Sequence, residues 1–374
     1  MNNIFKYIRE YGEFTFDEKK VTEVDILIFS QIPYLNFEGF CSPSLDGTAL
    51  STLWEDAKKI NTGTLGIAQR NAKKMLDMLS TKRRYKDLVL RDYVYYLQGG
   101  VQFGAISVVV PNDYIYVAFE GTDGTIWGWK EDFELSYTYP TGSQKMAADY
   151  LNNIIKFNGP KVVVCGHSKG GNLALVAAMN TNFVKKTRIE KIYSFDGPGL
   201  RREEFRSLNY KLTRNKLVNI IPNLSLVGVL LEQENVTVIK SNGIGIYQHD
   251  ASTWTIDGDK LKRTVQDSLS KTLDESIARW LYKYNYEERK EIIEGIFSIL
   301  EEANIKSIYD IQENKIKSVY AILKSSIDMS KETRDVILDS MKLLVSDVGN
   351  DIVNDGKKMF HDSIDKYFKD RKEV

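Results

Sequence analysis

The chain has 374 residues, of which 43% are hydrophobic and 27% charged, a composition typical of a folded globular protein. Basic and acidic residues both number 51, so the net charge of zero indicates neither nucleic-acid binding nor an acidic tail. No apolar run reaches the roughly 20 residues that a membrane-spanning helix needs, and charges interrupt the N-terminus where a signal peptide is apolar. We therefore expect a cytoplasmic protein without a transmembrane segment.

Residues 1–100 are predicted to be largely helical, and their apolar segment 25–37 needs burial, so we assign them to the same domain as the residues that follow. Beyond them, short runs rich in Val, Ile, Tyr and Phe alternate with helical patterns such as 143–157 and 169–180. This alternation predicts an α/β fold, with a mostly parallel sheet flanked by helices, over residues 1–258. The candidate strands are 101–110, 114–119, 161–165, 189–195, 217–221 and 236–240.

The remaining residues, 259–374, have a helical pattern with few breakers, and we predict a helical C-terminal region. Two capping-box patterns, in which side chains satisfy the first free amides of a helix, indicate helix starts at Thr272 and Asn285. An apolar stripe then recurs at helical spacing, at Leu344, Val348 and Ile352. Such a stripe packs on the chain's own core or offers a face to a partner or a membrane, and we favour the core.

The segment 161–175, KVVVCGHSKGGNLAL, contains the pattern Gly-x-Ser-x-Gly between an apolar strand and a helix of small residues. This arrangement is typical of a nucleophile elbow, here Gly166, His167, Ser168 and Gly170 with Lys169 between the last two. The serine lies on a tight turn that brings backbone segments close together, which leaves no room for side chains at the two glycines. We predict that Ser168 is a nucleophile. The alternative is an ordinary glycine-rich turn.

A serine hydroxyl needs a general base, and the chain has three histidines. His167 is next to Ser168 and is expected to point away from the reacting oxygen, while His361 lies in the C-terminal helical pattern. His249 follows the last strand-like segment, which fits the α/β-hydrolase order of serine, acid and histidine. We predict His249 as the base, against the alternative of a hydrogen-bonded loop histidine.

The acid that orients this histidine is predicted to be Asp196, the only aspartate between Ser168 and His249. It follows the strand 189–195, at the sheet edge where catalytic loops gather. Its alternative role is to cap the turn Asp-Gly-Pro-Gly that it begins. Two further carboxylates of this part of the chain are kept as fallbacks, Glu232 and Glu234.

An oxyanion hole needs donors aimed at the developing negative charge. Strand 114–119 leads into Glu120-Gly121-Thr122, so we expect the backbone amides of Thr122 and Lys169 to converge, with help from the Thr122 hydroxyl. The aromatic stretch 127–139 forms either a flap or an acyl-binding wall at the site, or ordinary core. Within it, Asp132 is expected to order the loop rather than to react.

These pieces resemble the class three (fungal-type) triacylglycerol lipases, in Phe-x-Gly-Thr at 119–122 and Gly-His-Ser-x-Gly-Gly at 166–171. Residues 1–257 are more similar to a bacterial domain-of-unknown-function family of predicted hydrolases, through GHSKGGNLA at 166–174, FDGPG at 195–199 and QHD at 248–250. The resemblance implies an α/β-hydrolase fold, Ser168 as nucleophile, His249 as base, and Thr122 with Lys169 as oxyanion donors.

The sequence departs from those lipases in two places. They have Arg in the Phe-Arg-Gly-Thr motif, where this chain has Glu120, and they carry the acid after the strand equivalent to 217–221, where this chain has Asn-Leu-Ser at 223–225. These differences bear on the identity of the acid and on lipid as substrate. The side chain of Lys169 is expected to be solvated, with recognition of an anionic group as the alternative.

We therefore predict a serine hydrolase, without metal or other cofactor, that cleaves a carboxylic ester of a small-molecule or lipid-like substrate through an acyl-enzyme. Thioester or amide cleavage uses the same parts. The rival hypothesis is a catalytically silent binding or scaffold protein that acts through its helical C-terminal region. Nucleotide binding is disfavoured, because the glycine-rich stretch lacks the phosphate cradle Gly-x-x-x-x-Gly-Lys-Ser/Thr.

Overall fold

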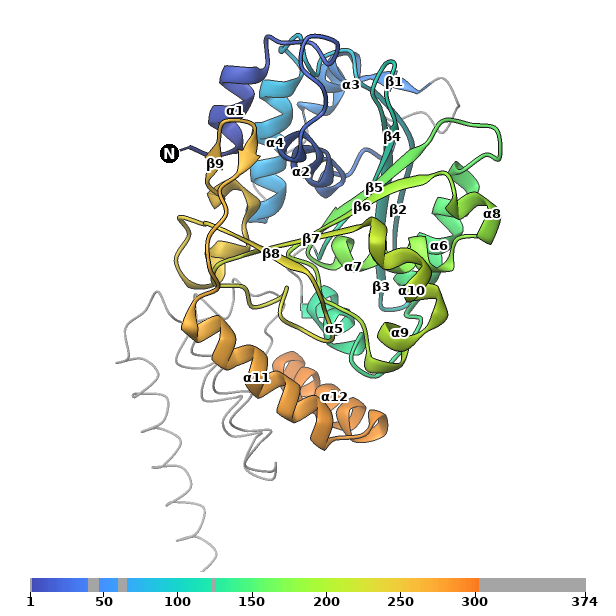
Figure 1. Cartoon of the computed structure of the whole chain (residues 1–374), viewed down its shortest axis with the longest axis vertical. Coiled ribbons are helices and arrows are strands. Elements are labelled where there is room, and N and C mark those ends of the chain that lie inside the picture. Colours follow the sequence, from blue (N-terminus) through green and yellow to red (C-terminus); the bar gives the residue numbers. More distant parts are fainter. Residues whose placement is uncertain (1, 40–46, 60–65, 123–125, 303–374) are drawn as a thin grey trace, which may run out of the picture.

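The computed structural model describes residues 2–39, 47–59, 66–122 and 126–302. Their centre is an eight-stranded sheet whose strands lie in the order of the sequence (Figure 1). The first three pairings are antiparallel, and the four that follow are parallel. The strands are β1 (Thr48–Ala49), β2 (Val89–Gln98), β3 (Val101–Val109), β4 (Ile115–Phe119), β5 (Val162–His167), β6 (Ile189–Phe195), β7 (Leu217–Pro222) and β8 (Val236–Ile239), with a separate hairpin of β9 (Ile256–Asp257) and β10 (Lys260–Leu261).

Helices cover both faces of this sheet, as Figure 1 shows. The parallel strands therefore have apolar side chains on both sides: in β5, Val163 and Cys165 face the core formed with α1 to α4, while Val162 and Val164 face α6 and α7. This is the expected α/β-hydrolase fold. The helices are α1 (Ile4–Tyr11), α2 (Glu23–Gln31), α3 (Leu50–Ala57), α4 (Ile67–Leu79), α5 (Ile126–Glu134), α6 (Gly142–Ile154), α7 (Lys169–Asn180), α8 (Phe183–Lys186), α9 (Arg202–Arg206), α10 (Leu208–Thr213), α11 (Ser268–Lys283) and α12 (Tyr286–Glu302), with short 3-10 turns at Ile32–Tyr34, Arg214–Lys216, Gly245–His249 and Ala251–Thr253.

All six strands expected from the sequence are present, with ends shifted by a residue or two. The described part of the first hundred residues contains α1 to α4, but it also supplies β1 and the ten-residue strand β2, which the sequence pattern did not reveal. The pattern is obscured because β2 carries Arg91 and Asp92 and bulges before Val94. The outer half of β2 is also partly exposed, so its side chains do not alternate cleanly between apolar and polar.

The predicted helix start at Thr272 is wrong. Helix α11 begins four residues earlier, at Ser268, because the Asp267 side chain accepts a hydrogen bond from the amide of Leu269 (2.8 Å) and caps the helix. The capping box at Asn285 is confirmed, since its side chain and that of Glu288 each bond the other's amide, at 3.1 and 2.8 Å.

The last two described helices pack at the lower edge of the molecule in Figure 1, with α12 against α5. Before them, the β9–β10 hairpin reaches back to the N-terminal part, where Leu261 N–H donates to the Glu23 carboxylate (2.7 Å). His361 and the stripe of Leu344, Val348 and Ile352 lie outside the described residues, and the division at residue 258 stays a prediction. No helix in the described ranges is both long and apolar enough to cross a membrane.

A buried ion pair joins α2 to the segment between α4 and β2. The Arg84 guanidinium lies 2.6 Å from the Asp25 carboxylate, and both side chains are fully buried. The Tyr85 hydroxyl donates to the same carboxylate (2.7 Å). Because the Asp25 carboxylate is fully buried, these partners provide the hydrogen bonds that water would otherwise make to it.

We predict that Arg84→Met lowers the free energy of unfolding by about 3–5 kcal/mol, because it leaves a buried carboxylate without its counter-charge. Lys161→Met is the matched control, since it removes an ion pair with Glu190 (2.6 Å) whose side chains are 48% and 36% exposed. The control is expected to cost less than about 1 kcal/mol. Urea unfolding measures both, and equal losses would contradict a dominant role for the buried pair.

Candidate active site

Ser168 occupies a strained turn between β5 and α7, with φ of 59° and ψ of −135°. A positive φ is costly for a residue with a side chain, so the surrounding structure has to hold it in place. The amide of Ser168 donates to the carbonyl of Phe195 (2.9 Å), and the carbonyl of Ser168 accepts from Gly171 (2.8 Å). The turn is thus fixed on both sides by main-chain hydrogen bonds.

The two glycines of the motif are required by contact with backbone. A Cβ on Gly166 would lie 2.0 Å from the carbonyl oxygen of Gly170, and a Cβ on Gly170 would lie 2.2 Å from the carbonyl oxygen of Phe119. Neither neighbour is a flexible side-chain end that moves aside. The predicted lack of room at both positions is therefore present in the structure.

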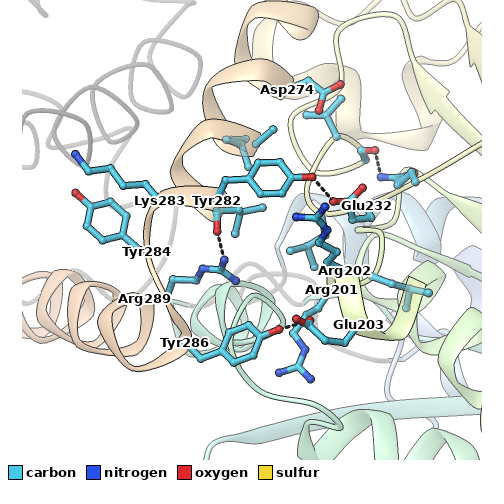
Figure 2. Close-up of a pocket in the computed structure, with 18 of the residues that line it drawn as sticks. Arg201, Arg202, Glu203, Glu232, Asp274, Tyr282, Lys283, Tyr284, Tyr286 and Arg289 are labelled. Atoms are coloured by element: carbon cyan, nitrogen blue, oxygen red, sulfur yellow. Dashed lines mark hydrogen bonds between the residues drawn. The ribbon is translucent and has the colours of Figure 1, made fainter. Parts of the chain in front are cut away.

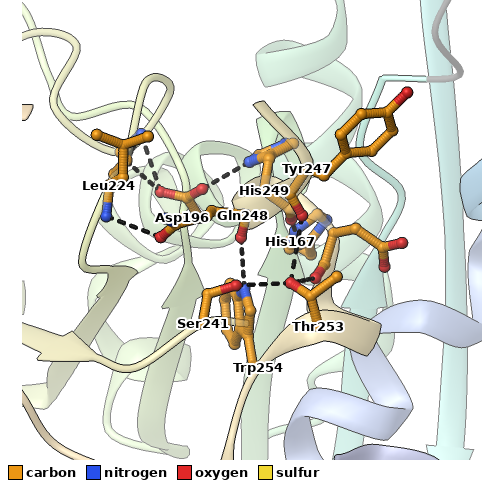
Figure 3. Close-up of polar contacts among 12 residues, drawn as sticks. His167, Asp196, Leu224, Ser241, Tyr247, Gln248, His249, Thr253 and Trp254 are labelled. Carbon is orange, nitrogen blue, oxygen red and sulfur yellow. Dashed lines mark hydrogen bonds and ion pairs between the residues drawn. The ribbon is translucent and has the colours of Figure 1, made fainter. Parts of the chain in front are cut away.

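Asp196 and His249, 53 residues apart in the sequence, are in direct contact (Figure 3). Nδ1 of His249 lies 2.6 Å from Oδ2 of Asp196, whose side chain is fully buried, while the His249 side chain is 19% exposed. The other oxygen of Asp196 accepts from the Ser225 hydroxyl (2.5 Å) and the Gly228 amide (3.1 Å). Asp196 is thereby held with one oxygen facing the imidazole, as a triad acid has to be.

His167 holds the backbone of His249. Its Nε2 donates to the main-chain carbonyl of His249 (2.8 Å), which leaves Nδ1 to accept from the Tyr34 hydroxyl (2.8 Å). Burial and the neighbouring His249 lower the pKa of His167 well below its ordinary value, so this ring is neutral. The two imidazoles lie 4.6 Å apart, centre to centre.

The link between nucleophile and base is not formed. Among the contacts of the described residues, no hydrogen bond joins the Ser168 hydroxyl to His249. Such bonds in ligand-free active sites are often long and shorten only when substrate is bound. The fallback acids have other partners: Glu232 accepts from Tyr282 (2.8 Å), and Glu234 accepts from Tyr210 (3.0 Å).

The loop after β4 lies against the elbow. A Cβ on Gly121 would lie 2.6 Å from the carbonyl oxygen of His167 and 3.0 Å from Cβ of Ser168. The next residue, Thr122, is therefore close to the serine, as its predicted role requires. Its hydroxyl donates to Asp132 (2.7 Å), so this proton is directed at a carboxylate and only the main-chain amide is left to serve as a donor.

Asp132 itself is buried on α5. Burial raises its pKa from 3.8 to about 6, against the opposing effects of Lys169 and Thr122. One of its oxygens, Oδ1, has no hydrogen-bond partner in the described part of the chain. Near neutral pH, Asp132 therefore keeps an under-solvated negative charge beside the oxyanion loop. The loop-ordering role expected for Asp132 agrees with its bond to Thr122.

The expectation that Lys169 is solvated is wrong. Its side chain is fully buried, and its Nζ lies 2.8 Å from the Glu131 carboxylate. Nζ also donates to the side-chain and main-chain oxygens of Gln102, at 2.7 and 2.9 Å. Sequence reasoning missed Gln102, Glu131 and Ser225 because each comes from a separate segment. The one available signal was a long cationic side chain directly after the serine, in a motif rich in glycine.

The aromatic stretch 127–139 includes α5, which packs against α12. The ring centroids of Phe133 and Phe297 are 5.8 Å apart, nearly edge to face. Arg289 of α12 donates to the carbonyl of Ser136 (2.7 Å), at the end of the same segment. These contacts favour the packing alternative for this stretch over a free flap.

A cavity of about 750 Å³ lies between β8, α9 and the pair α11 and α12 (Figure 2). Its floor is apolar, with Ile221 and Val229, and its rim carries arginines, carboxylates and tyrosines. Ser168 and His249 do not line it. One of its lining residues, Gly228, contacts the candidate site, because its amide donates to Asp196.

The family model described as Mbeg1-like matches residues 79–298, which is more than half of the chain. This match confirms the expected membership in a family of α/β hydrolases related to fungal-type lipases. Among solved structures, the chain is similar to the crystal structure of M37 lipase, with 19% identity and a TM-score of 0.35 over 56% of this chain and 69% of that chain. No curated protein matches.

We predict that Asp132→Asn stabilises the protein at alkaline pH. The wild-type carboxylate titrates at about 6 when folded and near 3.8 when unfolded, so burying its charge costs about 3 kcal/mol above pH 6. The cost falls as pH drops from 6 towards 4, because the folded protein then binds the proton. Asn keeps the acceptor for Thr122 and carries no charge.

Urea unfolding of both proteins at pH 8 and pH 4.5 measures this difference. The variant is expected to be more stable than wild type by about 3 kcal/mol at pH 8 and by only about 1 kcal/mol at pH 4.5. A variant that is less stable than wild type at pH 8, or a difference that does not change with pH, would contradict the raised pKa.

Proposed function

The chain belongs to the Mbeg1-like family of lipase-like α/β hydrolases, and from the site it carries we propose that it is a serine-dependent carboxylic ester hydrolase. One observation carries the proposal. The buried Asp196 carboxylate lies 2.6 Å from Nδ1 of His249, and the centre of the His249 ring lies 4.6 Å from that of His167, the residue before Ser168. An acid-oriented imidazole beside a strained serine is the arrangement that acyl transfer uses.

In the proposed reaction, the Ser168 oxygen attacks the acyl carbon of an ester while Nε2 of His249 takes the hydroxyl proton. Asp196 accepts from Nδ1–H, which fixes the tautomer and stabilises the imidazolium that forms. The amides of Thr122 and Lys169 bind the oxyanion of the tetrahedral intermediate. His249 then gives its proton to the leaving alcohol, and an acyl group remains on Ser168.

Water completes the cycle. His249, neutral again, takes a proton from a water molecule that attacks the acyl-enzyme. As the second tetrahedral intermediate breaks down, His249 returns this proton to the Ser168 oxygen and the carboxylic acid is released. The proposed substrate is a small acyl ester or lipid-like ester, and this chain's own residues supply every proton transfer. The proposed reaction requires Nε2 of His249 to reach the serine oxygen once substrate is bound.

A fluorophosphonate probe, which forms a covalent bond with an activated serine, tests the proposal. We predict that the wild-type protein is labelled and that Ser168→Ala is not. Ester hydrolysis by this variant is expected to fall by about 10⁴-fold or more, because the nucleophile is lost. Ser136→Ala is the control, since that hydroxyl donates to the carbonyl of Phe133 outside the site and its loss should leave labelling intact.

His249→Asn extends the test to the base. It keeps a side chain of similar polarity but has no group that takes the serine proton, so labelling is expected to slow by several orders of magnitude. A folded wild-type protein that neither reacts with the probe nor hydrolyses acyl esters of graded length would contradict the proposal. That outcome would instead favour a binding protein on a hydrolase fold, with the 750 Å³ cavity at α11 and α12 as its binding site.

A further inference from the structure

The lysine of the elbow is fully enclosed, and its hydrogen bonds are specific. Lys169 has three N–H donors on Nζ and three acceptors around it: the Glu131 carboxylate, the Gln102 side-chain oxygen and the Gln102 carbonyl, at 2.8, 2.7 and 2.9 Å. An ammonium group donates only, so all its capacity is used. Burying such a charge is costly even when it is paired, and an apolar side chain of the same volume fills such space at less cost.

This lysine sets the orientation of the Gln102 side chain. Because an ammonium cannot accept a hydrogen bond, the amide atom that faces Lys169 has to be the oxygen, Oε1. The amide nitrogen of Gln102 then faces the other way, where it donates to the carbonyl of Gly121 (3.1 Å). Both sides of Gln102 are therefore determined, and its side chain is buried.

The Gly121 carbonyl belongs to the peptide that carries the proposed oxyanion donor. In a trans peptide the C=O and the following N–H point in opposite directions. With the Gly121 carbonyl directed at Gln102, the amide of Thr122 has to point away from Gln102. Gly121 itself lies against the serine, since a Cβ there would be 3.0 Å from Cβ of Ser168.

We propose that Lys169 and Gln102 are positioning residues for the oxyanion hole, and this inference rests on the proposed function. Lys169 contributes one donor through its own amide and, through Gln102, orients the peptide that contributes the other. Glu131 is the counter-charge, and its second oxygen is held by the amide of Ser143 (3.2 Å). The buried charges thereby couple the elbow to the loop after β4.

Gln102→Glu tests the proposal at the smallest structural cost. A carboxylate still accepts from Lys169 but has no N–H for the Gly121 carbonyl, which it repels. We expect kcat to fall by about 100-fold with KM within about twofold of wild type, the pattern for loss of a transition-state donor. A trifluoromethyl ketone, which forms a tetrahedral adduct with an active serine, is expected to bind about 100-fold more weakly.

Gln31→Glu is the matched control, because Gln31 is a buried glutamine on α2 that donates to the Ser30 hydroxyl. This variant is expected to retain wild-type kcat and wild-type affinity for the ketone, even if it unfolds at lower urea. Gln102→Met, which also lacks the donor, is the second variant and is expected to repeat the loss of kcat should Gln102→Glu fail to fold.

Two outcomes overturn the inference. The first is a folded Gln102 variant with wild-type kcat, and the second is a loss of kcat that leaves ketone affinity unchanged. If the proposed function itself is wrong, the wild-type protein will neither hydrolyse esters nor react with the fluorophosphonate at Ser168. A wild type that does both, beside Gln102 variants equal to it, removes only the positioning role.

Discussion

The close approach of backbone segments at residues 166–170 is the constraint on which the site depends. Each of the two motif glycines meets carbonyl oxygen at about 2 Å from the place a Cβ would take, and Ser168 between them has a positive φ. A strained residue of this kind costs on the order of 1–3 kcal/mol. That strain is offset by the buried sheet around it, whose parallel strands have apolar contacts on both faces.

The orientation of the proposed acid, Asp196, depends on residues that follow it in the chain. The loop at 223–228, which places Ser225 and Gly228 against Asp196, is itself held by α11: Ser270 donates to the carbonyl of Ser225 (2.9 Å), and Asp267 N–H donates to that of Asn223 (2.7 Å). Helix α11 and the residue that caps it thus support the loop that orients the Asp196 carboxylate.

The sequence was informative where one local pattern determines one local structure. Buried strands appear as short apolar runs, and the elbow glycines are fixed by their position before and after Ser168. The partners of a buried charge cannot be predicted from such a pattern, because they come from segments that only folding brings together. Lys169 meets Glu131 across 38 residues and Gln102 across 67, and no spacing rule links them. The sequence pattern did not reveal β2 because polar residues and a bulge interrupt it. The start of α11 was misplaced because an aspartate caps this helix ahead of the predicted position.

A crystal structure of the protein after reaction with a fluorophosphonate shows directly whether Ser168 is the nucleophile and whether the two amides form its oxyanion hole. We expect phosphorus bonded to the Ser168 oxygen, with the phosphoryl oxygen about 3 Å from the amides of Thr122 and Lys169 and Nε2 of His249 hydrogen-bonded to the adduct. A phosphonyl group on another residue would contradict this expectation. So would an adduct on Ser168 whose phosphoryl oxygen points away from both amides, with His249 remote from it.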